Sequence, residues 1–137
     1  MEKVYIHNDC DVVINPTVLF HTKHPKAMAW CYFSIKIGKC INGLWDYGYT
    51  VAGGGSPVCL GQYENKDIAK EKAIQFLEEY FKKGFKGQGM YNEIYFKEAK
   101  TKFNIWVNKM FLSKESQTNH LVHIPDNGYN YSQTSLF

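Results

Sequence analysis

The sequence contains no apolar run long enough to cross a membrane. A transmembrane helix needs roughly 20 consecutive apolar residues, and no stretch of this chain approaches that length. The chain opens with Met1-Glu2-Lys3 and reaches Asn8-Asp9 after only a few apolar residues, which is not the pattern of a secretory signal. We therefore expect a soluble protein of the cytoplasm, without a membrane partner.

Cysteine is scarce and irregularly spaced. The four thiols, at Cys10, Cys31, Cys40 and Cys59, lack the secretory context in which disulfide frameworks form, so free thiols are expected. The chain also lacks a glycine-rich nucleotide fingerprint, an internal repeat and any local Cys/His or Ser/His pairing typical of nucleophilic catalysis. These absences lead us to predict a protein that is not an enzyme, with no catalytic residues and no cofactor.

Aromatic residues are abundant, at 16% of the chain. Aromatic side chains anchor interfaces and stack on nucleic-acid bases, but small β-rich domains also use them as core and cross-strand pairs. The net charge of +3 permits contact with nucleic acid without arguing for it. Hydrophobic residues make up 45% of the chain, which is enough for a packed core.

Periodicity predicts an α+β domain at residues 1–115, followed by a polar tail at 116–137. We expect an antiparallel sheet of about four or five strands with two C-terminal helices packed on it. The glycine-rich residues around Gly54 are expected to form a loop. The expected strands lie at residues 4–6, 12–20, 28–39, 44–52 and 58–63.

Asn42-Gly43 lies between two of these strands. The pair favours a two-residue type I′ hairpin, because both central residues of that turn need a positive φ. Such a turn would set Lys36 opposite Tyr49. One face of the hairpin would then be aromatic and include Lys36, and the other would be aliphatic and ready to receive a helix.

Two helices are expected after the strands. Asn65 or Asp67 can cap the first, which should end near Lys83, and Asn92 can cap the second, which should end near Leu112. Each helix has an apolar stripe at helical spacing. The stripes consist of Ala69, Ala73, Phe76, Leu77 and Tyr80 in the first helix, and of Tyr95, Ala99, Phe103, Trp106 and Met110 in the second.

Two pairs of potential metal ligands occur near the start of the chain. His7 and Cys10 are three residues apart, as are His21 and His24, and this arrangement resembles the ligand spacing of small zinc sites. A strand hairpin could bring the pairs together. The alternative is that these histidines are solvated or hydrogen-bonded without a metal.

The expected aromatic face of the hairpin is a candidate nucleic-acid surface. Trp45, Tyr47 and Tyr49 beside Lys36 are the residue types that bind single strands, by base stacking and by phosphate contact. The alternative is that the aromatic residues form core beneath the second helix, which needs a place to bury its own apolar stripe.

The tail ends in an apolar pair after a polar stretch. Gln133, Thr134, Ser135, Leu136 and Phe137 form a peptide that could enter a hydrophobic pocket on another protein. This pentapeptide resembles the bacterial sliding-clamp-binding motif, whose usual form is Gln-Leu-Ser/Asp-Leu-Phe. Four positions match, and Thr134 stands where the motif prefers Leu, which should weaken binding without abolishing it.

This resemblance implies a partner and not an activity. The implied partner is the β sliding clamp of bacterial DNA polymerase III, with DNA as a further candidate. Residues 30–81 also resemble small accessory domains of phage and plasmid mobile elements, but that resemblance carries no site residues. The leading hypothesis is an accessory protein of DNA replication or repair in a phage or mobile element. The alternative is a module that binds single-stranded nucleic acid.

Overall fold

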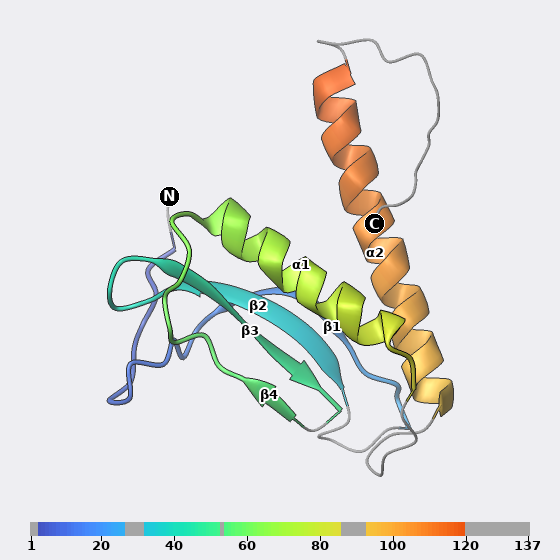
Figure 1. Cartoon of the computed structure of the whole chain (residues 1–137), viewed down its shortest axis with the longest axis horizontal. Coiled ribbons are helices and arrows are strands. Elements are labelled where there is room, and N and C mark those ends of the chain that lie inside the picture. Colours follow the sequence, from blue (N-terminus) through green and yellow to red (C-terminus); the bar gives the residue numbers. More distant parts are fainter. Residues whose placement is uncertain (1–2, 27–31, 53, 86–92, 120–137) are drawn as a thin grey trace. The chain divides into compact units, whose positions relative to one another are not determined.

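The protein is built on a four-stranded antiparallel sheet with the strand order β1-β2-β3-β4, as Figure 1 shows. The computed structural model describes residues 3–26, 32–52, 54–85 and 93–119. The α+β class and the antiparallel sheet expected from the sequence are confirmed. The elements are β1 (Thr17–Thr22), β2 (Phe33–Lys39), β3 (Trp45–Val51), β4 (Gly54–Ser56), α1 (Lys66–Lys82) and α2 (Glu93–Asn119).

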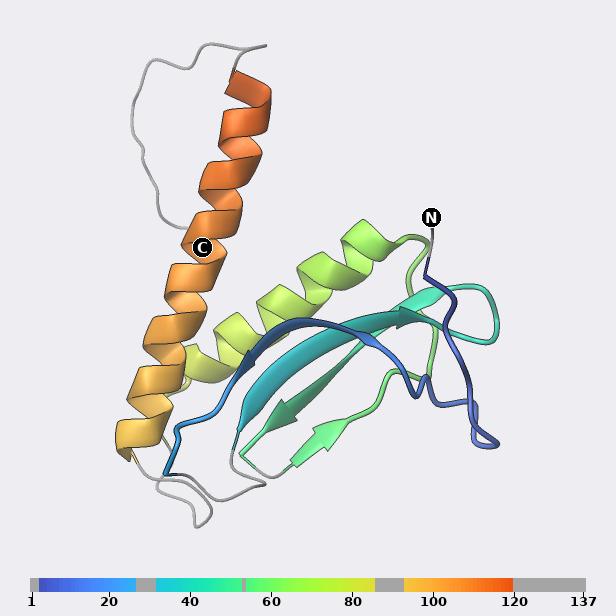
Figure 2. The same ribbon diagram turned by 180° about the vertical axis from the view of Figure 1, so that it is seen from behind.

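The chain forms two compact units, Met1–Phe103 and Asn104–Phe137. The first unit contains the whole sheet, α1 and the beginning of α2. In it, α1 lies along one face of the sheet (Figures 1 and 2). We call this the helix-covered face and the opposite one the second face. Among the described residues, no helix combines the length and apolar character that crossing a bilayer requires.

The turn between β2 and β3 differs from the expected two-residue hairpin. Cys40 N–H donates to the carbonyl of Leu44, and Gly43 N–H donates to the carbonyl of Cys40, so the loop contains three residues. Only Gly43 takes a positive φ, of 84°. The amide of Asn42 bonds instead to Leu44 N–H and to the carbonyl of Gly61. These bonds hold Asn42 in a turn of a different type, with glycine at the left-handed position.

The longer turn shifts the predicted register by one residue. Lys36 lies opposite Gly48 instead of Tyr49, and Tyr49 pairs with Ile35. Because side chains alternate between the two faces of a strand, a one-residue shift moves every side chain of one strand to the other face relative to its neighbour. The aliphatic and aromatic residues therefore share the helix-covered face, and the prediction that they lie on opposite faces is wrong.

The edge strand β4 also corrects a prediction. It forms within the glycine-rich segment that was expected to be a loop, and it pairs with the end of β3, with Gly55 opposite Thr50. A Cβ atom at Gly55 would collide with the carbonyl oxygen of Tyr49, so this pairing depends on the absence of a side chain. The strand predicted at residues 58–63 does not form; that segment has one isolated bridge, between Trp45 and Tyr63.

The N-terminal segment contributes less strand than predicted. β1 starts at Thr17 and ends at Thr22, and the earlier residues have one isolated bridge, between His7 and Val13. Val13 packs with Cys40 and Val58 in a small buried cluster, against which Tyr5 lies. Because Val13 and Val58 also lie close to Gly38 of β2, this cluster covers the turn end of the second face.

Helix α1 begins as predicted. The side chain of Asn65 accepts a hydrogen bond from Ile68 N–H at 2.9 Å, which is an N-cap bond. Asp67 lies in the first turn and not at the cap. The buried residues of the helix are Ala69, Ala73, Leu77 and Phe81, so the stripe includes Phe81, while Phe76 and Tyr80 lie at its border.

Helix α2 is longer than predicted, since it continues to Asn119 instead of ending near Leu112. Its expected cap, Asn92, lies outside the described residues. Phe96, Ala99 and Phe103 are buried in the first unit, where the ring of Phe96 lies 5.4 Å from that of Phe81. The buried stripe thus starts at Phe96 and not at Tyr95, which is only partly buried.

The carboxylate of Asp46 joins β3 to the segment that follows β4. Asp46 is 2% exposed. It accepts hydrogen bonds from the backbone N–H groups of Tyr47, Leu60 and Gly61 at 2.8–3.0 Å and from the side-chain amide of Gln62 at 3.3 Å. Each of these bonds involves a charged acceptor, and such bonds are stronger than neutral ones. Asp46 thereby holds residues 60–62 against the sheet.

Replacing Asp46 should destabilise the fold more than any change at an exposed aspartate. Asp46→Ala leaves the buried N–H of Gly61 and the partly buried N–H groups of Tyr47 and Leu60 without this acceptor. We expect it to lower the free energy of unfolding by about 3 kcal/mol. Asp46→Asn should lower the free energy of unfolding by less, because one side-chain oxygen can still accept hydrogen bonds. Urea denaturation followed by circular dichroism measures both. The control is Asp9→Ala in an exposed loop, with an expected change within about 0.5 kcal/mol. Equal losses at both positions would contradict this role.

Candidate functional site

The predicted aromatic surface is packed beneath α1. Tyr49 stacks on Phe76 with 3.9 Å between ring centroids, and Tyr47 lies 6.0 Å from the same ring. Tyr63 stacks beside Tyr47 at 6.4 Å. Burial raises the pKa of the Tyr47 hydroxyl, and the neighbouring Tyr63 and Tyr49 raise it further. These tyrosines stabilise the interface between α1 and the sheet.

The other two members of the predicted surface lie elsewhere. Lys36 points to the second face, because its partner in the register is Gly48 and not a tyrosine. Trp45 makes an edge-on contact with Tyr5, with ring centroids 5.5 Å apart. The structure therefore does not bring Lys36 together with Tyr47 and Tyr49.

The four predicted metal ligands have separate surroundings. The imidazole of His7 bonds through Nε2 to the carbonyl of Lys39 at 2.9 Å, and the ring of His21 lies 5.2 Å from that of Tyr32. Cys10 is exposed, and His24 contacts the beginning of α2. Within the described ranges, no three His, Cys, Asp or Glu side chains are grouped so that they could hold a metal ion.

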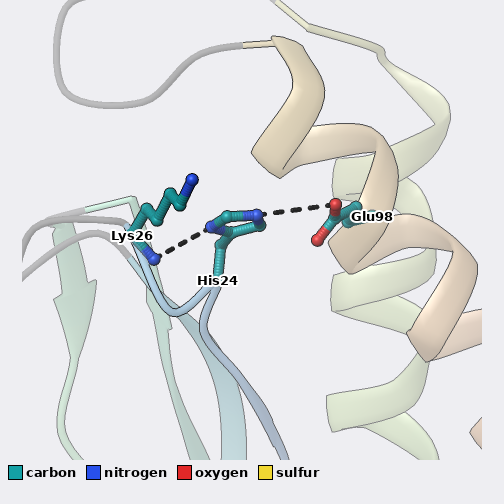
Figure 3. A network of polar contacts seen from close by, with 3 residues as sticks. All are labelled: His24, Lys26 and Glu98. Carbon is teal, nitrogen blue, oxygen red and sulfur yellow. Dashed lines mark hydrogen bonds and ion pairs between the residues drawn. The ribbon is translucent and has the colours of Figure 1, made fainter.

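His24 is the centre of a small polar cluster between the end of β1 and the start of α2 (Figure 3). Its ring stacks on Tyr95 at 4.4 Å. Lys26 N–H donates to Nδ1 at 3.0 Å, so the neutral ring carries its proton on Nε2. That nitrogen faces Oε2 of Glu98 at 3.6 Å. The histidine thus fastens the loop after β1 to the first turns of α2.

The space beside His24 is too small for an organic substrate. A pocket of about 10 Å³ remains between Thr22, Lys23, Phe33 and the start of α2, which is room for one water molecule. The Nδ1 atom of His24 is already bonded to the backbone. The cluster is therefore better suited to positioning the loop than to chemistry on a ligand.

The second face carries two rows of side chains that cross the strands. His21, Ser34, Thr50 and Gly55 are successive partners in the first row. Val18, Lys36 and Gly48 form the second row. His21 and Val18 are exposed, whereas Lys36 and Thr50 are half-buried.

Tyr32 extends the second face beyond the start of β2. Its carbonyl accepts a hydrogen bond from Ala52 N–H, which continues the ladder by one step. Tyr32 therefore shares a face with Ser34 and Lys36 and lies beside His21. Sequence reasoning missed Tyr32, because the shifted register assigned the aromatic side of the hairpin to Tyr47 and Tyr49. The alternation of Tyr32, Ser34 and Lys36 was the available signal.

Cys40 is a buried thiol of low reactivity. It is 3% exposed, within the cluster formed with Val13 and Val58. Burial raises the pKa of the thiol to about 11, and the negative charge of Asp46 adds to the shift. Since the thiolate is the reactive form, this environment protects Cys40 from alkylation and oxidation.

The predicted partner peptide, residues 133–137, lies outside the described residues. Comparison with known proteins provides no family for the chain: no family model, no curated protein and no solved structure matches it.

The thiols should differ strongly in reactivity. With a pKa near 11 in place of 9.0, Cys40 has about a hundredfold less thiolate near pH 8 than an unperturbed thiol. We expect iodoacetamide to label exposed Cys10 readily and Cys40 only after denaturation. Peptide mass spectrometry after timed labelling measures each site. Equal labelling of Cys10 and Cys40 in the folded protein would contradict the burial of Cys40.

Proposed function

We propose that the protein is a non-enzymatic accessory factor that binds the bacterial DNA sliding clamp and acts in, or inhibits, DNA replication or repair of a phage or mobile element. One observation carries the proposal, namely the sequence Gln133-Thr134-Ser135-Leu136-Phe137 after a polar stretch. Its similarity to the clamp-binding motif covers four of five positions. The proposal assigns a partner to this peptide and leaves the sheet free for another role.

The chemistry of the peptide suits a pocket of modest affinity. Gln133 offers both a donor and an acceptor, which can fix the register of an extended peptide. Leu136 and Phe137 supply apolar area worth about 1.5–3 kcal/mol each when fully buried. Ordering a peptide consumes part of this energy, so the sum corresponds to micromolar binding. A ring-shaped dimeric clamp offers two pockets, so contacts of the domain with the clamp, or a second linked copy of the peptide, would add avidity.

The position of the buried core supports the expectation that residues 133–137 can be removed without destabilising the fold. The buried hydrophobic residues of the described ranges lie between Val13 and Val107, in the sheet, in the two helices and in the small cluster of Val13, Cys40 and Val58. The interactions identified above as stabilising, at Asp46 and at Asn65, also lie far from residue 133 in the sequence. Deletion of residues 133–137 should therefore leave the melting temperature within about 2 °C of the wild-type value.

Loss of the apolar pair should abolish clamp binding. We expect Leu136→Ala/Phe137→Ala to remove retention of the purified bacterial β clamp in a pull-down, because both apolar anchors are lost. The matched control is Leu121→Ala/Val122→Ala, which removes two aliphatic side chains of the same tail outside the motif and should bind normally. Equal retention by the double mutant and the wild type would overturn the proposal.

Restoring the preferred residue at position 134 should strengthen binding. Thr134→Leu adds apolar area in a position that the motif normally fills with leucine, so we expect the dissociation constant to fall by up to about tenfold. Isothermal titration calorimetry with the purified clamp measures the change. Ser135→Asp, which the motif also accepts, is the control and should be nearly neutral. Weaker binding by Thr134→Leu would show that the peptide does not occupy the pocket in the expected register.

A further inference from the structure

From the second face of the sheet, we infer that this surface binds single-stranded nucleic acid. The inference is independent of the clamp-binding peptide, since it rests on β1, β2 and β3 and not on the tail. The residues that carry it are His21, Tyr32 and Lys36, with the half-buried Thr50 on the neighbouring strand.

Part of the second face is covered by neighbouring segments of the chain, and the remainder is open. Val13 and Val58 lie against Gly38 at the turn end of the sheet, and the backbone of residues 56–58 lies against Gly48. α1 lies on the opposite face, where Phe76 packs on Tyr49. At the other end of the second face, His21 remains exposed and Val18 is 57% exposed. The accessible side chains on this part of the face are therefore the exposed Val18 and His21 and the half-buried Tyr32 and Lys36, while Ser34 between them is buried.

The charge of this surface fits an anionic ligand. The four strands contain a single acidic residue, Asp46, and its buried carboxylate is saturated by hydrogen bonds. Lys36 is half-buried on the second face, and it makes no ion pair within the part of the chain that the structure describes. A lysine whose stem lies along the sheet and whose ammonium group makes no ion pair in the described residues is available to contact a phosphate.

The shape and residue types of the face favour a single strand over another anion. The rings of His21 and Tyr32 lie 5.2 Å apart at one end, where they offer aromatic surface to unpaired bases. Ser34, the next partner in this row, is buried at 4% exposure, and the half-buried Thr50 follows it. The row ends at Gly55, where no side chain projects. Neighbouring strands are separated by about 4.8 Å, so the row of four strands has room for roughly two or three bases.

The first test is binding itself, measured by fluorescence anisotropy with labelled oligo-dT and oligo-U at increasing salt concentration. We expect affinity for at least one oligomer, falling as salt rises; the tighter of the two identifies the strand as DNA or RNA. Absence of binding at low salt would overturn the inference. So would equal affinity for a blunt duplex, because paired bases cannot stack on the rings.

The second test uses variants of the full chain. Lys36→Gln should weaken binding and reduce the slope of log affinity against log salt by roughly 0.7, the effect of one phosphate contact. Tyr32→Ala should weaken binding by about fivefold or more through lost stacking, whereas Tyr32→Phe should retain affinity. His21→Ala, at an exposed position, tests stacking at the same end with little risk to folding.

The matched control is Lys72→Gln, which removes the same charge from an exposed position on α1, beyond the opposite face of the sheet. Lys72→Gln should bind like the wild type, and an equal loss at Lys36 and Lys72 would overturn the inference. Leu136→Ala/Phe137→Ala should also retain nucleic-acid binding. The test of nucleic-acid binding is therefore independent of the test of clamp binding. Tighter capture of polyglutamate than of either oligomer would assign the face to an acidic peptide and refute the nucleic-acid ligand.

Discussion

The buried carboxylate of Asp46 is the constraint on which the rest of the structure depends. The chain leaves β4 on one side of the sheet and must begin α1 on the other, within the few residues before Asn65. Asp46 fixes this crossing by binding the backbone at Leu60 and Gly61. Gly61 adopts a φ of 67°, and the adjacent Trp45–Tyr63 bridge completes the crossing. With the crossing fixed, Val58 covers one end of the second face and α1 covers the other face.

The features that sequence reasoning predicted correctly depend on local chemistry. The α+β class follows from the change between strand and helix periodicity, and the Asn65 cap follows from a side chain that bonds three residues ahead. The register of the hairpin could not be found in this way. It depends on Asn42 bonding to Gly61, which is distant in the sequence, and this bond selects the three-residue turn. Similarly, β4 depends on a close approach between Gly55 and β3 that no propensity reveals.

The one-residue difference between the predicted and the observed register of β2 and β3 decides which side chains are available to bind a partner. The sequence predicts Tyr47 and Tyr49 as neighbours of Lys36, but both tyrosines pack against Phe76 of α1. The actual neighbours of Lys36 are found by following the alternation of β2 toward Tyr32 and the pairing toward β1. The predicted zinc ligands failed to converge for a related reason, because each histidine already contacts the backbone or another ring. The spacing of these histidines along the sequence cannot show that each one contacts the backbone or another ring.

The edges of the sheet have a consequence for the behaviour of the protein at high concentration. β4 offers only three residues, Gly54–Ser56, at one edge, and the ladder of β1 at the other edge is irregular between Val18 and Phe20. Strands of another molecule pair best with long, flat edges. A short edge and a bent one give an approaching strand few consecutive backbone groups to match. Molecules of this protein are therefore expected to reach high concentration without their sheets pairing into fibres.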